Sequence, residues 1–327
     1  MHLFRTNVIK NKPLYEKFIN FYNITNFDGE AIVVVDIIND SVCMDGFTII
    51  GGTTDVLINN VNNCSIISCI VKDSSNGIKI ASGSDNNTIS HCNFTSNSYG
   101  VFISGSYNWI GSQFMDKLCD DCYFTYNNYG IYVDNSHDNM IVGCNINATP
   151  DPSSPPMASY GVCLDDSENN TMVFSSVSKA SNNGYGVYMD DSNNNFICHN
   201  LIKENDYGVF LTSSYDNRIA MNNISNNSFS GVSIIMISSS NNSVHWNDFI
   251  GNGHGIYPQA FDDGSGNYWN TSGNETLNYV SAGEGNYWSD YNGSDNDGDG
   301  IGDTSYSIAG TANAVDSYPV MKANEFE

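Results

Sequence analysis

The chain has 327 residues, more than one compact hydrophobic core usually reaches, so two domains or a repeat architecture are expected. Acidic residues outnumber basic ones by 36 to 11, and the net charge of −25 excludes nucleic acid as a partner, because nucleic-acid binding needs a basic surface. No apolar stretch is long enough to span a membrane, and residues 1–18 contain no apolar core of a secretion signal.

The N-terminal residues 1–40 are predicted to form a cap and a first strand. Within them, residues 13–22 (PLYEKFINFY) have the apolar spacing of a short amphipathic helix. Such a helix would cover the open end of the structure that follows.

A pentapeptide of Gly and alternating apolar residues recurs along residues 76–258, from NGIKI and YGVFI to SGVSI and HGIYP. Self-similarity at one period indicates stacked repeats, whose strands would pair with the coils above and below at about 4.8 Å. We therefore predict an all-β fold, a single-stranded right-handed parallel β-helix of about 9–10 coils over residues 41–257, with terminal caps. Two longer gaps contain insertions, at 111–121 and 149–158. The repeat glycines are Gly77, Gly100, Gly130, Gly161, Gly186, Gly208, Gly231 and Gly255.

An Asn register has the same period, eight to eleven residues after most repeat glycines. Asn suits a stack at a bend, because its amide donates and accepts along the column and its backbone tolerates left-handed conformations. A structural ladder is therefore predicted. Its members are Asn87, Asn108, Asn139, Asn170, Asn195, Asn217 and Asn242.

A cysteine register lies eight residues before the repeat glycine, after allowance for an insertion, and continues in later coils as Asn200, Asn223 and Asn247. Stacking at about 4.8 Å lies within the Cα separation of a disulfide, so vertical bridges are one prediction. A column of reduced, buried thiols is the alternative. The candidates for disulfide bonds are Cys69, Cys92, Cys122 and Cys144.

Strand alternation places an aromatic side chain outward in most coils, two residues after the repeat glycine. The next outward position is Asp in three successive coils, at Asp134, Asp165 and Asp190. Rings stack on sugar faces, and carboxylates accept hydroxyl hydrogen bonds or hold calcium, so a glycan-binding surface is predicted. A purely stabilising aromatic stack is the alternative, and the Tyr residues directly before five of the repeat glycines are predicted to form one. The glycan-binding candidates are Phe102, Tyr132, Tyr188, Phe210 and Tyr257, with Cys163 in the same register.

The string DNDGDGIGD near the C-terminus places carboxylates at positions 1, 3, 5 and 9 of a calcium loop, with Gly at position 6. Tyr306 stands at position 12 in place of the usual Glu, and no flanking helices are evident, so the loop is not a complete EF-hand. Calcium is the predicted cofactor, and it would stabilise the C-terminal segment. The predicted ligands are Asp295, Asp297, Asp299, the Ile301 carbonyl and Asp303.

Residues 258–327 are predicted to form the C-terminal cap, around the related sequences GNYWN at 266–270 and GNYWS at 285–289.

The repeat YG[VI]x[VIL], the Asn register and the ending GNYWSDYNGSDNDGDGIGD with VDSYPVM resemble the NosD-type parallel β-helix proteins, over roughly residues 45–321. Relatives with this ending are frequent among archaeal surface proteins, especially in methanogens, so the resemblance implies this fold and a place at the cell surface. The founding members assist copper insertion, but Met and His do not cluster here as a copper relay would.

Pectate lyases, polygalacturonases and epimerases share this fold class. By that resemblance the three Asp residues would bind calcium or act as acids, with His137, Lys203 or Arg218 as partners. Lyases that act on uronates usually need Arg or Lys beside their carboxylates, and the scarcity of basic residues in the repeats disfavours catalysis.

Two functions therefore remain open. The first is a non-catalytic extracellular surface protein that assembles with itself into a filament, sheath or layer, or that contacts cell-surface glycans. Thirteen Asn-x-Ser/Thr sequons would suit a glycosylated exterior. The second is a calcium-dependent polysaccharide lyase, hydrolase or epimerase that uses the Asp row.

Overall fold

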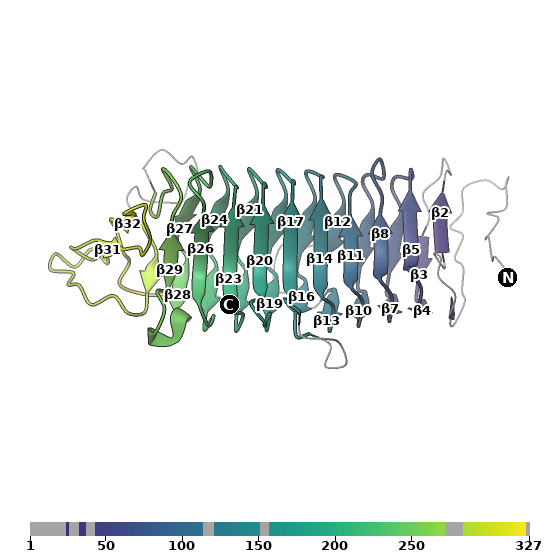
Figure 1. The fold of residues 1–327 in the computed structure, drawn as a ribbon, viewed down its shortest axis with the longest axis horizontal. Helices are drawn as coiled ribbons and strands as arrows, with labels where there is room; N and C mark the ends of the chain where they lie inside the picture. Colours follow the sequence, from purple (N-terminus) through teal and green to yellow (C-terminus); the bar gives the residue numbers. More distant parts are fainter. Residues whose placement is uncertain are drawn as a thin grey trace.

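The structure, a computed structural model, describes residues 24–25, 33–36, 43–113, 121–150, 157–271 and 284–324. The chain winds into an elongated right-handed stack of coils (Figure 1), which confirms the predicted all-β parallel β-helix. The predicted helix at 13–22 lies outside the described residues, as do residues 114–120 and 151–156 of the two insertions. The domain boundaries at 40/41 and 257/258 stay predictions.

Each complete coil contributes one strand to each of three parallel sheets, in the chain order C, A, B. Sheet A contains β1 (Ile24–Thr25), β4 (Thr48–Ile50), β7 (Ile70–Lys72), β10 (Asn93–Thr95), β13 (Tyr123–Thr125), β16 (Asn145–Asn147), β19 (Ser176–Ser178), β22 (Leu201–Lys203), β25 (Asn223–Ser225), β28 (Asp248–Ile250) and β30 (Tyr287–Trp288). Sheet B contains β2 (Val33–Asp36), β5 (Thr54–Asn59), β8 (Asn76–Ile80), β11 (Tyr99–Ile103), β14 (Tyr129–Asp134), β17 (Tyr160–Asp165), β20 (Tyr185–Asp190), β23 (Tyr207–Thr212), β26 (Ser230–Ile235) and β29 (Ala260–Asp262). Sheet C contains β3 (Cys43–Asp45), β6 (Ser65–Ile67), β9 (Thr88–Ser90), β12 (Trp109–Gly111), β15 (Met140–Val142), β18 (Thr171–Val173), β21 (Phe196–Cys198), β24 (Arg218–Ala220) and β27 (Ser243–His245).

Seven of the eight repeat glycines, from Gly77 to Gly231, stack in one column, as predicted, because the backbones of successive coils meet there. A Cβ added at Gly100 would lie 2.6 Å from the carbonyl oxygen of Gly130, and one added at Gly130 would lie 2.6 Å from that of Gly161. No other residue fits at such distances without a shift of the backbone. The residue after each of these seven glycines points inward, and Val101, Ile131 and the other residues of that column are fully buried, whereas Ile256, after Gly255, is exposed.

The predicted Asn ladder fills the corner between sheets B and C. Each side-chain Nδ2 donates to Oδ1 of the Asn one coil further on, at 3.0–3.1 Å, from Asn87 to Asn267. Buried amides are thus satisfied along the whole column, which stabilises the corner without any ligand.

The corner between sheets C and A holds the cysteine register and its Asn continuation. Asn200 donates to Asn222, and Asn222 donates to Asn247. The prediction of Asn223 in this column is therefore wrong by one residue, because Asn223 begins β25 and pairs in register with Leu201.

A third polar column, which was not predicted from the sequence, fills the corner between sheets A and B. Its members include Ser74, Asn97, Asn127, Asn205, Asn227 and Asn252.

The last predicted repeat, HGIYP, does not form a strand. Asn252–Gly255 form a short 3-10 helix (η1), in which Gly253, His254 and Gly255 have positive φ. The backbone N–H of Gly231 donates to the carbonyl of Gln259, so Gln259 and not Gly255 follows Gly231 in the glycine column. Strands β29 and β30 carry sheets B and A beyond residue 257, and β31 (Tyr306–Ser307) pairs antiparallel with β32 (Val315–Asp316) at the C-terminal end.

Candidate functional site on sheet B

The outer face of sheet B carries the predicted aromatic row. Phe102 pairs in register with Tyr132, and Tyr188 pairs with Phe210, with ring centroids 5.1 and 5.7 Å apart. All four rings are half-buried. Cys163 stands between the two pairs in the same register but is itself buried, so the row is interrupted in the middle.

Lys79 stands at the start of this row, a position that was not predicted from the sequence. It pairs in register with Phe102, and its ammonium group lies 4.8 Å from the centroid of that ring, a cation–π distance. The repeat NGIKI contained the signal, since it places Lys79 at the outward position of its coil.

The Tyr residues directly before five of the glycines form a second stacked column, as predicted, which meets the aromatic row edge-on, as Tyr129 does at Tyr132. Successive rings lie 4.5–5.2 Å apart and nearly parallel. These contacts stabilise the stack of coils, and each ring has little free face left for a ligand. The column contains Tyr99, Tyr129, Tyr160, Tyr185 and Tyr207.

The three predicted carboxylates also stack, because Asp134 pairs in register with Asp165 and Asp165 with Asp190. The Tyr132 hydroxyl donates to Oδ2 of Asp165 at 2.5 Å, and the Tyr188 hydroxyl lies 3.4 Å from Oδ2 of Asp190. Aromatic and carboxylate rows therefore form one connected surface, here called the aromatic–carboxylate surface. It consists of Phe102, Tyr132, Tyr188, Phe210, Asp134, Asp165 and Asp190.

Burial and neighbouring carboxylates favour the neutral forms of Asp134, Asp190 and Tyr132. Burial, and then the neighbouring Asp165 carboxylate, raise the pKa of Asp134 above its usual value. Burial is also the main cause at Asp190, where Asp191 and Asp165 raise the pKa further. At Tyr132, burial and the hydrogen bond to Asp165 raise the pKa, so the phenol is a hydrogen-bond donor at neutral pH.

The prediction that Tyr257 belongs to the aromatic row is wrong. Tyr257 follows η1 outside sheet B, and its ring meets Phe229 edge-on at 5.2 Å. Phe261 pairs with Ser233 and takes the corresponding place in the last strand. The positive-φ residues of η1 divert the chain, which a repeat pattern alone does not reveal.

Two of the three predicted partners of the Asp row lie on other sheets. Lys203 is on β22 of sheet A, and Arg218 is on β24 of sheet C, so both predictions are wrong. The Arg218 guanidinium instead lies over the rings of Phe196 and Trp246, at 5.3 and 5.8 Å.

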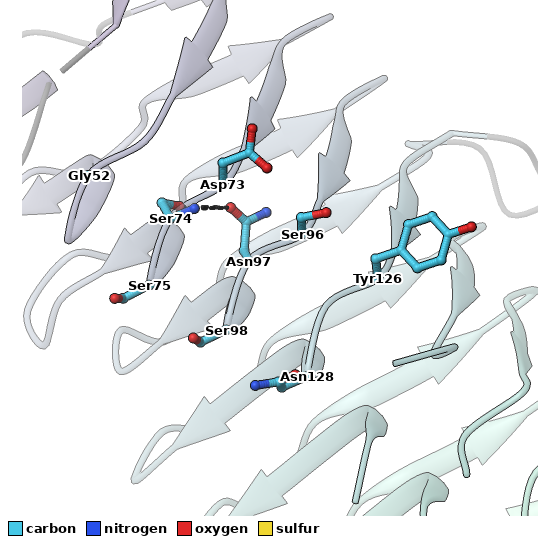
Figure 2. A pocket seen from close by; sticks show the side chains of 9 residues that line it. All are labelled: Gly52, Asp73, Ser74, Ser75, Ser96, Asn97, Ser98, Tyr126 and Asn128. Carbon is cyan, nitrogen blue, oxygen red and sulfur yellow. Dashed lines mark hydrogen bonds between the residues drawn. The ribbon is translucent and has the colours of Figure 1, made fainter. Parts of the chain in front are cut away.

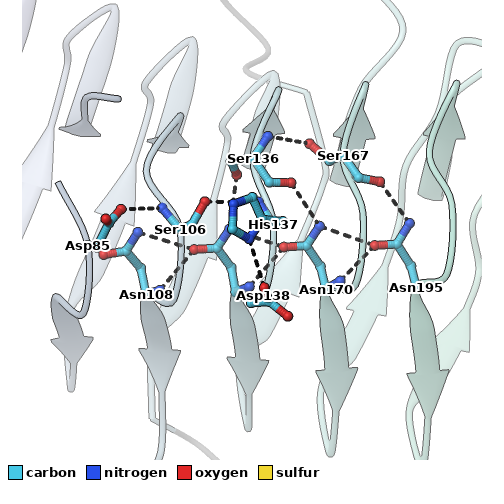
Figure 3. A network of polar contacts seen from close by, with 10 residues as sticks. Asp85, Ser106, Asn108, Ser136, His137, Asp138, Ser167, Asn170 and Asn195 are labelled. Carbon is cyan, nitrogen blue, oxygen red and sulfur yellow. Dashed lines mark hydrogen bonds and ion pairs between the residues drawn. The ribbon is translucent and has the colours of Figure 1, made fainter. Parts of the chain in front are cut away.

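His137 does lie near the Asp row, in the turn that follows β14. Its Nδ1 is 2.7 Å from Oδ2 of Asp138, beside the Asn ladder (Figure 3). His137 also lines a depression of about 110 Å³ with Asp166, Glu168 and Asp191. This turn extends the acidic character of the Asp row.

The predicted calcium loop brings three carboxylates together. Ligand oxygens of Asp295, Asp297 and Asp299 lie within 4.8 Å of one another. Asp295 also accepts hydrogen bonds from the backbone N–H groups of Gly298 and Gly300, which fixes the turn. Asp303 faces Asn296 instead and accepts from its backbone and side-chain nitrogens.

Tyr306, at the place of the missing Glu, belongs to the hydrophobic end of the solenoid. Its ring stacks on Trp288 at 4.1 Å, and its hydroxyl donates to Asp290. An oxygen-only set of three carboxylates suits a hard cation such as calcium.

The cysteine register forms a buried column of free thiols. Cys92 Sγ donates to the carbonyls of Ser90 and Ile66, at 3.1 and 3.6 Å, as the Asn222 amide does to Ala220 and Ile197. Cysteine thus replaces Asn as a donor in this corner. Burial is the main cause that raises the pKa of Cys122 well above its usual value, so its thiol is not a ready metal ligand.

Residues 120–293 match the family described as periplasmic copper-binding protein (NosD), which is more than half of the chain, and residues 56–154 match the right-handed β-helix region. The chain belongs to the NosD family. No curated protein matches this NosD-family chain. No helix in the described part is long and apolar enough to cross a membrane.

Solved structures resemble the NosD-family chain in fold. The A-module of the mannuronan C-5 epimerase AlgE4 of Azotobacter vinelandii is 16% identical, with a TM-score of 0.51 over 75% of this chain and 80% of the module. The Dettilon tailspike protein is 14% identical, with a TM-score of 0.49; the match covers 81% of this chain but only 58% of the tailspike chain. The alginate lyase of Paenibacillus sp. is 10% identical, with a TM-score of 0.43 over 75% of this chain and 88% of the lyase.

The copper binding in the family description does not fit the residues described here. Copper sites use thiolate, thioether or imidazole donors. In the described ranges, the carboxylates of Asp295, Asp297 and Asp299 are the one set of three His, Cys, Asp or Glu ligand atoms within 4.8 Å of one another. We therefore derive no copper chemistry for this NosD-family chain.

Proposed function

We propose that this chain works outside the cytoplasm as a non-catalytic β-helix that contacts glycans and is stabilised by calcium. The observation that carries the proposal is the aromatic–carboxylate surface, whose rings and carboxylates lie in register over consecutive strands of one sheet. A polysaccharide has its own repeat along one direction, so a surface with a repeat of about 4.8 Å offers it successive contacts.

The chemistry of the surface suits a sugar chain. Half-buried rings offer apolar faces to sugar C–H groups, and the Asp side chains accept hydrogen bonds from hydroxyls. Lys79 at one end provides a donor and a positive charge. The family's periplasmic description supports a location outside the cytoplasm.

The position of the basic residues favours binding over catalysis. Removal of a proton beside a uronate carboxylate needs cationic groups that neutralise the developing charge. In the part of the chain that the structure describes, Arg218 and Lys203 lie on other sheets, and Lys79 lies three coils before Asp165.

Polysaccharide lyase, hydrolase or epimerase activity is the second candidate. One observation favours it, namely the short hydrogen bond from Tyr132 to Asp165 beside Asp134, whose pKa is raised. Paired groups with shifted pKa values are common in active sites.

One experiment separates the two candidates. Alginate, polygalacturonate and a neutral mannan are each mixed with the full chain, with and without calcium, and both binding and product release are measured. We expect binding without turnover, weakened about thirtyfold when Tyr132 and Tyr188 are both replaced by Ala, since each ring contributes of order 1 kcal/mol. Tyr215→Ala, which removes an exposed ring at a turn outside the surface, is the matched control. Turnover lost in Asp165→Ala would establish the catalytic alternative, and no binding to any polymer would refute the proposal.

The calcium part of the proposal rests on the Asp295, Asp297 and Asp299 cluster. The loop is joined to the C-terminal end of the chain, since the N–H of Gly302 donates to the carbonyl of Pro319 and that of Met321 to Gly300. A bound cation would offset the repulsion among the three carboxylates and stabilise this junction.

A further inference from the structure

A polar groove lies away from the aromatic–carboxylate surface, at the corner where sheet A turns into sheet B. It has a volume of about 340 Å³, and its lining residues come from four consecutive coils, from Gly52 to Asn128. Sites for small molecules span roughly 300–1,000 Å³, so this groove is large enough for a short oligosaccharide.

The groove has a rigid floor and two polar rims. Ser74 and Asn97 form the floor, where both are buried and joined by a 2.7 Å hydrogen bond. Figure 2 shows Asp73, Ser96 and Tyr126 on one side of this floor, with Ser75, Ser98 and Asn128 on the other. The floor belongs to the third polar column, whose hydrogen bonds hold the rims in place.

The rims offer hydrogen-bonding groups that the protein itself does not use. Side chains of the floor are engaged, since Asn97 Nδ2 donates to Val71 and Asn127. In contrast, the hydroxyls of Ser75, Ser96 and Ser98 have no hydrogen-bond partner in the described part of the structure. A hydroxyl both donates and accepts, which matches the hydroxyls of a sugar.

Tyr126 is the feature that points to a ligand. Its φ is 58°, a left-handed conformation that bulky residues rarely adopt, and 43% of its surface is exposed. Within the described ranges its ring packs against no other aromatic ring, unlike the stacked Tyr129 three residues later. Gly51, Asp73, Ser96 and Asn226 occupy the same turn in other coils, so the fold does not require an aromatic residue there.

The charge of the groove indicates which sugars fit. The Asp73 carboxylate would repel a uronate or a phosphate. The neighbouring Lys72 is already paired with Asp73, with its Nζ 3.7 Å from Oδ2 of that carboxylate. We propose that this groove binds a short neutral saccharide, which stacks on the exposed face of Tyr126 and exchanges hydrogen bonds with Asp73, Ser96 and Ser98. The site is separate from the aromatic–carboxylate surface.

The test uses the full chain and four neutral disaccharides, namely maltose, cellobiose, lactose and N,N′-diacetylchitobiose, with digalacturonate as the acidic comparison. Binding is measured by saturation-transfer NMR and by isothermal titration. We expect at least one neutral disaccharide to bind and digalacturonate to bind more weakly.

Matched variants locate the site. Tyr126→Asn removes the ring but keeps a residue that adopts positive φ readily, so folding is preserved, and it should weaken binding about tenfold. Tyr126→Phe should retain binding. Tyr123→Ala removes a similarly exposed ring from sheet A of the same coil and should change nothing. The Tyr132 and Tyr188 variants of the aromatic–carboxylate surface should also leave disaccharide binding unchanged, which keeps the two proposals distinguishable.

Two results would overturn the inference. One is that none of the neutral disaccharides binds. The other is binding that Tyr126→Asn leaves at wild-type strength.

Discussion

The indole Nε1 of Trp288 donates a 2.9 Å hydrogen bond to Oδ2 of Asp316, in the interior of the C-terminal end. The same carboxylate oxygen accepts from the backbone N–H of Asn286 at 2.7 Å. At the preceding corner of the same coil, the Trp269 indole donates to Oδ2 of Asp262, and the Asn267 side-chain amide donates to Oδ1 of that residue. In each copy of the repeated sequence GNYW, Asn and Trp therefore donate hydrogen bonds to one buried carboxylate. Asp316, the acceptor for the second copy, comes from the VDSYP segment.

Asp316→Ala should destabilise this end by about 2–4 kcal/mol, because it leaves several buried donors without an acceptor. Denaturation monitored by Trp fluorescence would measure the loss. Asp45→Ala, at an exposed carboxyl of β3, should leave the free energy of unfolding within about 0.5 kcal/mol of the wild-type value. Equal effects of the two substitutions would contradict this account.

Asp55 should make the solenoid less stable as the pH rises. It occupies the glycine-column position before Gly77, is fully buried, and its carboxylate oxygens have no hydrogen-bond partner. Burial raises its pKa from 3.8 to about 7; the nearby Ser74 hydroxyl opposes this shift, and the Asp73 carboxylate adds a smaller contribution to it. A pKa raised in the folded state means that the stabilisation is complete below about pH 4 and is lost as the pH rises through about 7.

Asp55→Asn should therefore remove a decrease of order 2–4 kcal/mol in the free energy of unfolding between pH 4 and 7.5. The substitution should also stabilise the protein at neutral pH. Urea denaturation at several pH values would measure this. A variant that keeps the wild-type slope would show that another group titrates.

Gly130→Ala should destabilise the protein by about 1–3 kcal/mol, since the added methyl group would lie 2.6 Å from the Gly161 carbonyl oxygen and 2.7 Å from Ile146 Cγ2. Gly255→Asn is the control, because Gly255 has φ +70° and no atom within 4 Å of an added Cβ, and Asn tolerates this conformation. Thermal unfolding of both variants tests the close approach of coils. A harmless Gly130→Ala would argue against it.

Calcium should raise the unfolding temperature of the full chain. At a concentration one hundred times its dissociation constant, a ligand of the folded state contributes about 2.7 kcal/mol. Asp297→Asn, in the Asp295 and Asp299 cluster, should abolish the shift, whereas Asp45→Asn should retain it. A melting curve that calcium leaves unchanged in the wild type would refute the proposed site.

The thiols of Cys92 and Cys122 should react slowly with iodoacetamide in the folded protein. Both are fully buried, and their pKa values are raised, so the reactive thiolate is rare. Mass spectrometry after alkylation, with a urea-unfolded sample as the control, would measure the protection. Rapid labelling of the folded chain would contradict this placement, and so would a disulfide between neighbouring cysteines.

The sequence by itself determined the stacking and most of what stacks. Side chains one period apart become neighbours in a solenoid, so the glycine column, the Asn87 ladder and the pairs Phe102–Tyr132 and Asp134–Asp165 could be predicted from spacing alone.

Only the tertiary structure decided where each side chain lies around the coil, because turn lengths vary and a shift of one residue moves a side chain to another face. That shift replaces Asn223 by Asn222 in one ladder, and the larger diversion at η1 removes Tyr257 from the aromatic row. The groove beside Tyr126 also emerged only in three dimensions, since its rims come from three coils separated by more than twenty residues of sequence.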